Sequence, residues 1–265
     1  MTPLAAYVDG IAVIGPGLAN WPDAATVLSG QQSYAPGPLV VPAPAALPPA
    51  ERRRVGRITR LAIEAGLDAC GRAGLDTTKL ATVFASSGGD GDNYHAICET
   101  LATTMRQLSP TRFHNSVHNA TAGYWSIATG AMAPSTALCA YDASFAAGLL
   151  EALTQVVSGR APVLLIACDT SYPPPLHETR PVLDGFAVAM VLAFARGKHS
   201  LARLAAALVA APADRCDLAA LEALRVQIPP ARSLPLLACI ARRQAGSVVI
   251  EYLDQCGLRT TVTPC

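Results

Sequence analysis

Charged side chains are scarce in this sequence, and their scarcity excludes several classes of partner. Aspartate, glutamate, lysine and arginine make up 15% of the 265 residues, and the formal net charge is +1. No strongly basic or acidic stretch stands out as a binding surface for nucleic acid or an anionic membrane. We therefore expect neither nucleic acid nor a membrane as a partner.

Long apolar runs, a secretory leader and metal-binding cysteine motifs are also missing. No window reaches the 18 or more apolar residues of a membrane helix, and the start MTPLAAYVDG lacks the basic residues of a signal peptide. The eight cysteines are scattered without a CxxC pair or another metal-ligand spacing. We expect reduced thiols, a cytoplasmic location, no metal and no cofactor.

Apolar residues, in contrast, are abundant. They account for 51% of the chain, and the mean hydropathy is +0.33. Much of this content is alanine, valine and leucine spread over the whole sequence. Such a composition is typical of a chain that buries an extra face against a partner.

Strands and helices alternate along the sequence. Strands are predicted at residues 8–14, 80–85, 163–168 and 186–194; helices at 21–30, from 58 to a stop at 74, and at 143–157; a proline-rich loop at 35–49; and a hairpin at the C-terminal end. Asn20 or Asp23 begins the first helix, and Gly74 ends the second. This alternation predicts an α/β domain with a layered sheet.

Asp142 stands between a strand-like run, residues 135–141, and the apolar helix that follows it. A carboxylate at a helix N-terminus accepts hydrogen bonds from free amide groups, which stabilises a helix by about 1 kcal/mol. The same position would lower the pKa of a cysteine thiol. The aspartate by itself favours the helix cap, but the location suits either residue.

The longer stretch LSPTRFHNSVHNATAGYWSIATGAMAPSTALCAYDASFAAG resembles the β-ketoacyl synthase family. The resemblance is specific over residues 108–167 and looser over 8–196, and SGRAPVLLIACDTS extends it. Counted without gaps from Pro110, Asn119, Gly123 and Pro134, the catalytic cysteine of the family falls on Asp142. Cys139 comes three residues too early.

This resemblance implies a thiolase-like layered α/β/α fold, truncated to essentially the N-terminal half of a ketosynthase. It further implies a single domain over residues 1–265, with a core at about 5–200 and a closing helix and hairpin at about 215–264. The ending GSVVIEYLDQCGLRTTVTP resembles the closing hairpin of the family, so we expect a complete chain.

Two departures from the family concern its chemistry. The nucleophile is replaced by a carboxylate, whose acyl product would be a mixed anhydride rather than a thioester. The catalytic histidine pair of the family belongs to glycine-rich loops, and none of the five histidines, His95, His114, His118, His177 and His199, lies in such a loop. Both departures indicate a pseudoenzyme with no catalytic residue.

Within the family the chain is most similar to the chain-length-factor subunits of type II polyketide systems, in the short form of aryl polyene clusters. The resemblance implies a heterodimer with a full-length ketosynthase, transient contact with an acyl carrier protein, and a role in shaping the polyketide or fatty-acyl product tunnel. It assigns the tunnel or the interface to Arg112, Phe113 and Ser116, and it makes Asp142 a filled former active site, held by helix amides.

Other interpretations stay open. Asp142 could act as a general base or assist decarboxylation, and the protein could be a structural or carrier-protein docking module. The segment with Phe113 could be an interface loop without a role in the tunnel.

Four smaller features each have a functional and a structural interpretation. SSGGDGD, residues 86–92, reads as a tight turn or a phosphate cradle, and the arginines at 52, 53, 54, 57 and 60 read as a solvated helix face or a docking patch. His114 and His118 could share a metal, and His118 could pair with Ser144 as in hydrolases, but a third ligand and a GxSxG motif are missing from the sequence.

Overall fold

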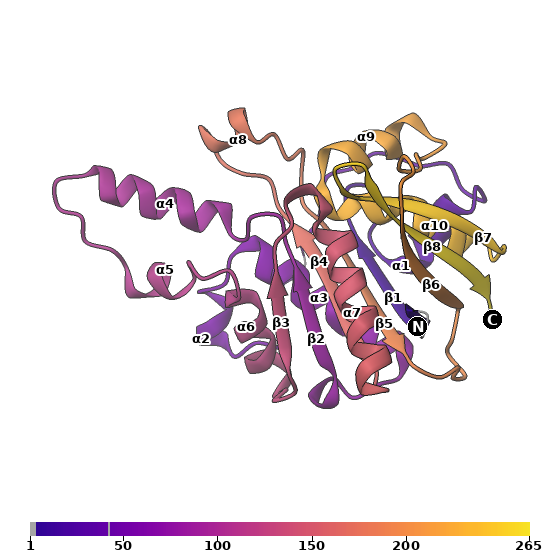
Figure 1. Cartoon of the computed structure of the whole chain (residues 1–265). Coiled ribbons are helices and arrows are strands. Elements are labelled where there is room, and N and C mark those ends of the chain that lie inside the picture. Colours follow the sequence, from indigo (N-terminus) through magenta and orange to yellow (C-terminus); the bar gives the residue numbers. More distant parts are fainter. Residues whose placement is uncertain (1–3, 42) are drawn as a thin grey trace.

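The computed structural model describes residues 4–41 and 43–265, and one mixed sheet of eight strands runs through them (Figure 1). The strand order is β3-β2-β4-β5-β1-β6-β8-β7. β2, β3 and β4 are parallel to one another, and every other neighbouring pair is antiparallel. The strands are β1 Leu4–Ile14, β2 Ala81–Ala85, β3 Ser135–Leu138, β4 Val163–Asp169, β5 Phe186–Ala193, β6 Ala202–Val209, β7 Gly246–Leu253 and β8 Cys256–Pro264.

Helices cover both faces of this sheet, which confirms the predicted layered α/β/α fold. The helices are α1 Trp21–Leu28, α2 Pro49–Arg52, α3 Arg57–Ala73, α4 Gly91–Ala102, α5 Pro110–His114, α6 Ala120–Thr129, α7 Ser144–Gly159, α8 Leu176–Thr179, α9 Ala219–Gln227 and α10 Leu234–Ala241, with the short 3-10 turns η1 Thr77–Lys79, η2 Tyr141–Ala143 and η3 Pro229–Ser233. None of the described helices is long and apolar enough to cross a membrane.

Two apolar cores lie on the two faces of the sheet. α1, α7, η3 and α10 share one core, in which Phe145 and Leu149 of α7 are fully buried. α3 and α6 share the other, in which Leu61 and Trp125 are buried. α3 and α7 therefore lie on opposite faces of the sheet, each with its apolar stripe buried, as the layered arrangement requires.

Local signals placed several element ends correctly. The Asn20 side chain accepts a hydrogen bond from the Asp23 amide and caps α1, and Gly74 ends α3 in the left-handed conformation. The C-terminal hairpin is β7 and β8. Strand β6 was not predicted, because its run ARLAAALV is as compatible with a helix as with a strand.

The two edges of the sheet differ in whether their backbone groups are already paired. At the β7 edge, the Val249 amide donates to the Asp214 carboxylate (2.7 Å), and the Asp214 amide donates to the Val249 carbonyl (2.9 Å). At the other edge, β3 pairs only with β2, and the part of the chain that the structure describes supplies no strand on its outer side. Since an unpaired edge strand is a template for another chain, β3 is the edge open to a partner.

An arm made of α4 and α5 projects from the sheet beyond β3 (Figure 1). The Asn93 side chain donates to the Arg112 carbonyl (2.9 Å) and ties the two helices together. The arm exposes Leu101, Met105 and Phe113. Exposed apolar side chains concentrated on one projection are typical of a protein-binding surface.

A buried carboxylate joins the ends of β2 and β4. Asp169, at the end of β4, is 1% exposed and accepts hydrogen bonds from the Ser86 hydroxyl (2.9 Å), the Ser87 amide (2.9 Å) and the Ser87 hydroxyl (3.0 Å). Burial raises the pKa of Asp169 from 3.8 to about 6, although the three donors oppose the shift.

We predict a pH dependence of stability from this raised pKa. The folded chain binds the Asp169 proton more tightly than the unfolded chain, so this group makes the protein less stable as the pH rises from about 4 to about 6, by up to about 3 kcal/mol. Asp169→Asn keeps an acceptor oxygen for the two serines and removes the titration. In urea unfolding across this pH range, the free energy of unfolding of the variant should increase relative to that of the wild type as the pH rises. A difference between the two proteins that is independent of pH would contradict the assignment.

Candidate functional site

The site that the sequence singles out is the turn between β3 and α7. β3 ends at Leu138, and η2 leads into α7. The Ser144 hydroxyl donates to the Tyr141 carbonyl (2.7 Å) and accepts from the Ala140 amide (3.0 Å), so one side chain closes the turn from both sides. The strand is shorter than predicted: it ends at Leu138, and Tyr141 lies beyond it in the left-handed conformation (φ 52°), which regular β-strands do not adopt.

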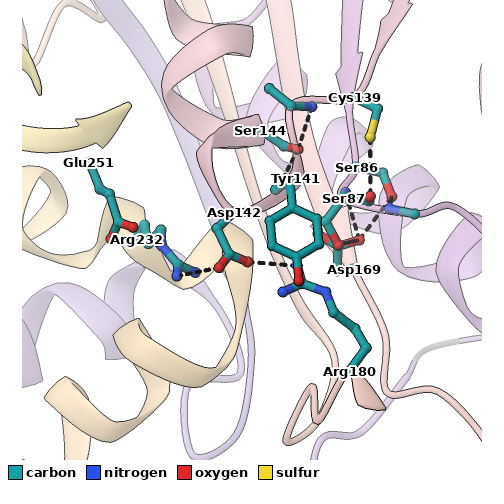
Figure 2. A network of polar contacts seen from close by, with 12 residues as sticks. Ser86, Ser87, Cys139, Tyr141, Asp142, Ser144, Asp169, Arg180, Arg232 and Glu251 are labelled. Atoms are coloured by element: carbon teal, nitrogen blue, oxygen red, sulfur yellow. Dashed lines mark hydrogen bonds and ion pairs between the residues drawn. The ribbon is translucent and has the colours of Figure 1, made fainter. Parts of the chain in front are cut away.

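Asp142 is held by two arginines, and the prediction that helix amides hold it is wrong. Arg180 lies 2.6 Å from one carboxylate oxygen, and Arg232 lies 3.0 Å from the other (Figure 2). Ala143 is the N-cap of α7, and no side chain caps the helix there. The 3-10 turn at η2 places the Asp142 carboxylate where two guanidinium groups reach it, and charged donors bind a carboxylate more strongly than neutral amides do.

The contact between Asp142 and Arg232 continues into a row of alternating charges. Arg232 also reaches Glu251 on β7 (3.1 Å), and Arg225 on α9 lies 3.9 Å from Glu251 and 2.7 Å from Glu222. The hydrogen bond from Arg225 lowers the pKa of Glu222 to about 2. The row ties the turn after β3 to the C-terminal elements of the fold.

A second row of polar contacts lies on the other side of the turn. Cys139 donates its thiol to the Ser87 carbonyl (3.1 Å), and Ser87 in turn binds Asp169 (Figure 2). Arg180 lies over the Tyr141 ring, with its guanidinium carbon 3.6 Å from the ring centroid. The turn is thus held by ion pairs on one side and by a buried serine–aspartate cluster on the other.

The residues predicted for the product tunnel or the interface lie away from this turn. Arg112 and Phe113 belong to α5, on the projecting arm, and Ser116 follows in the next turn. Both α5 side chains are exposed, Phe113 to 67%. Asp142 forms its ion pairs with Arg180 and Arg232, which lie outside the arm, so the two parts of the predicted site are separate regions of this chain.

The SSGGDGD stretch takes its structural interpretation, and His118 and Ser144 have separate partners. Ser86 Oγ accepts the Gly89 amide (2.9 Å) and Asp90 caps α4, so SSGGDGD is a tight turn. His118 lies near the Ser86 carbonyl (3.4 Å), while the Ser144 hydroxyl is engaged in its own turn. In residues 4–41 and 43–265 no group of three histidine, cysteine or acidic side chains is arranged to hold a metal ion.

The predicted arginine patch has mostly local partners. Arg52 donates to the Leu47 and Ala45 carbonyls, and Arg54 pairs with Glu51. These contacts hold the loop before α3. The carboxylates of Glu51 and Asp184, which pair with Arg54 and Arg57, neutralise part of the positive charge on this surface.

Arg180 and Arg232 are the functional candidates that sequence reasoning missed. Arg180 lies 38 residues from Asp142, in the loop before β5, and Arg232 lies in η3. No spacing rule connects either arginine with Asp142, because the contacts depend on the order of the strands and not on a local pattern. Only the buried position of Arg232, at 7% exposure, marks it as paired, since a buried arginine requires counter-charges.

Known structures of the same architecture match almost the whole chain. A chain of the complex between the ketosynthase ApeO and its chain length factor ApeC from Xenorhabdus doucetiae is 25% identical, with a TM-score of 0.74 and coverage of 97% of this chain and 99% of that one. A chain of the AntDE:AntF complex, described as a type II polyketide synthase acyl carrier protein with its ketosynthase, is 13% identical, with a TM-score of 0.76 and full coverage of both chains.

Longer ketosynthases match over part of their length. The ketosynthase of module 1 of the bacillaene synthase from Bacillus amyloliquefaciens FZB42 is 15% identical, with a TM-score of 0.59, and the match covers 80% of this chain but 47% of that one. No curated protein matches the sequence. The sequence profile of the family described as "Beta-ketoacyl synthase, N-terminal domain" matches residues 21–244. Because this match spans most of the sequence and agrees with the fold, the chain belongs to the β-ketoacyl synthase family.

Proposed function

We propose that this protein is a noncatalytic, chain-length-factor-like subunit that pairs with a full-length ketosynthase and shapes the product tunnel of the heterodimer. The observation that carries the proposal is the state of Asp142. At the position that the resemblance assigns to the nucleophile, both carboxylate oxygens are engaged by arginines at 2.6 and 3.0 Å. The match to nearly all of a chain from the ApeO–ApeC complex supports the same conclusion.

The geometry argues against covalent chemistry at this turn. An acylated carboxylate would be an anhydride, and forming it would break two ion pairs. Cys139 is three residues earlier in the chain, and its thiol donates to the Ser87 carbonyl. A general-base role for Asp142 is less well supported, because each carboxylate oxygen is already bound by an arginine.

The ketosynthase partner is proposed to bind along β3. β3 is the open edge of the sheet, while Asp214 already pairs with the β7 edge. Met132, just before β3, is 93% exposed, and Phe113 on the neighbouring arm is 67% exposed. Adding a strand at this edge would extend the sheet and cover these apolar side chains, with an expected interface above about 1,000 Å².

The resemblance places control of product length on the arm. Arg112, Phe113 and Ser116 lie on and just after α5, and the arm projects beyond the open edge. A side chain on such a projection can reach a cavity in the partner. Arginine and phenylalanine are also enriched in ordinary interfaces, so an interface loop without a role in the tunnel is the competing interpretation.

The proposal also covers the carrier protein, the cellular location and the domain organisation. Transient contact with an acyl carrier protein follows from the family, and the description of the AntDE:AntF complex names such a protein. All eight cysteines are free thiols, which supports a cytoplasmic location. The continuous sheet from β1 to β8 supports treating residues 1–265 as one domain.

Replacing Asp142 distinguishes a positioning role from a catalytic one. Asp142→Asn removes one of the two counter-charges of the buried Arg232, so the free energy of unfolding should fall by about 1–3 kcal/mol. Asp217→Asn, which breaks an exposed ion pair with Arg242 of similar length (2.7 Å), is the matched control and should cost less than about 1 kcal/mol. In the complex reconstituted with the ketosynthase, product formation per complex should persist in Asp142→Asn. Loss of product with the complex intact would support the general-base alternative.

Variants of the arm test the control of product length. In the reconstituted complex, Phe113→Ala should lengthen the product and Ser116→Trp should shorten it, because a smaller or larger side chain moves the end of the tunnel. The rate of the first condensation should remain nearly unchanged. The chain-length distribution and the yield of complex are measured on the same samples. If the yield falls and the length distribution stays constant, the arm is an interface loop only.

A further inference from the structure

Tyr141 combines exposure with an unfavourable backbone conformation. Tyr141 is 59% exposed. Its φ of 52° lies in the left-handed region, which a bulky residue seldom adopts. Such a conformation persists only where the surrounding structure imposes it, and it is found most often at functional sites. A solvent-exposed tyrosine that served only to fill the turn could be replaced by glycine without this strain.

Three layers of contacts hold the Tyr141 ring in place. Arg180 stacks on the ring at 3.6 Å, Asp142 binds Arg180 at 2.6 Å, and the 93%-buried Arg232 binds the other carboxylate oxygen of Asp142 (Figure 2). Ser144 fixes the backbone by accepting the Ala140 amide and donating to the Tyr141 carbonyl. The ring is therefore exposed and yet fixed, so little side-chain entropy remains to be lost when a partner covers it.

The ring also lies at a particular place in the fold. Tyr141 follows the last residue of β3 by three positions, and β3 is the open edge of the sheet. Met132, on the other side of β3 in the sequence, is almost fully exposed. The chain therefore passes from the open strand into the Tyr141 turn within three residues.

We propose that Tyr141, stacked on Arg180, is an anchor residue for the ketosynthase partner, and that Asp142 is a positioning residue for this anchor. The inference rests on the proposed function. Asp142 neutralises Arg180, so the stack presents an aromatic face and a phenol hydroxyl rather than a net positive charge. The complementary site on the ketosynthase is an apolar pocket with a hydrogen-bonding group at its base, since rigid tyrosines bind in this way at the centres of interfaces.

The test measures binding and stability together. Tyr141→Ala and Tyr141→Gly are compared with wild type for affinity to the ketosynthase by titration calorimetry, and for the thermal midpoint of the isolated chain. We expect both variants to bind about 10-fold more weakly or worse. The thermal midpoint should change little, and glycine should be the more stable variant because it relieves the positive φ. Arg180→Gln should weaken binding in the same direction by releasing the ring.

Phe194→Ala is the matched control. Phe194 is 40% exposed and has Arg160 stacked on it at 5.3 Å, but it follows β5, whose end pairs with the start of β4 and so lies at the opposite end of the sheet. The affinity of Phe194→Ala for the ketosynthase should equal that of the wild type. If both Tyr141 variants bind the ketosynthase with wild-type affinity, Tyr141 is not an anchor. If both variants unfold the isolated chain, the tyrosine is needed for the fold, and the anchor is overturned as well. Absence of any wild-type complex would refute the proposed function itself.

Discussion

The ion pairs between Asp142 and the two arginines are the interaction on which the rest of the site depends. Arg232 is nearly buried and needs counter-charges, which Asp142 and Glu251 supply from two different parts of the chain. Arg180 approaches from the opposite side. A single carboxylate therefore connects the loop before β5, the turn after β3 and the C-terminal elements. A cysteine at this position would leave both arginines without that partner, so the present surroundings favour the carboxylate.

The two edges of the sheet differ in how accessible their backbone groups are to a partner. One edge, at β7, has backbone groups bound by the Asp214 loop, and the other, at β3, is short, open and flanked by exposed apolar side chains. Proteins protect edge strands against unwanted pairing, so an edge left open beside an apolar arm favours specific association. The turn stabilised by Asp142 begins at the end of this open strand. The open strand and the Asp142 turn are thus parts of one continuous segment of the chain.

Much of the fold could be predicted from the sequence, because short-range rules govern it. Asn20 caps a helix, Gly74 ends one, and the apolar spacing of α3 and α7 determines which faces are buried. The family resemblance supplied the layered arrangement. β6 could not be predicted because alanine-rich sequence is ambiguous between helix and strand. The contacts of Asp142 could not be predicted because their distant arginine partners meet it only after the sheet has assembled.

Hydrogen exchange of the isolated chain and of its complex with the ketosynthase is the most direct measurement of the central claim. The outward amides of β3 have no strand partner in the described chain, so they should exchange quickly in isolation and slowly in the complex. The turn through Tyr141 should be protected with them, and β7 should stay unchanged. Protection at β7 with none at β3, or a complex that leaves β3 exchanging as before, would contradict pairing through this edge.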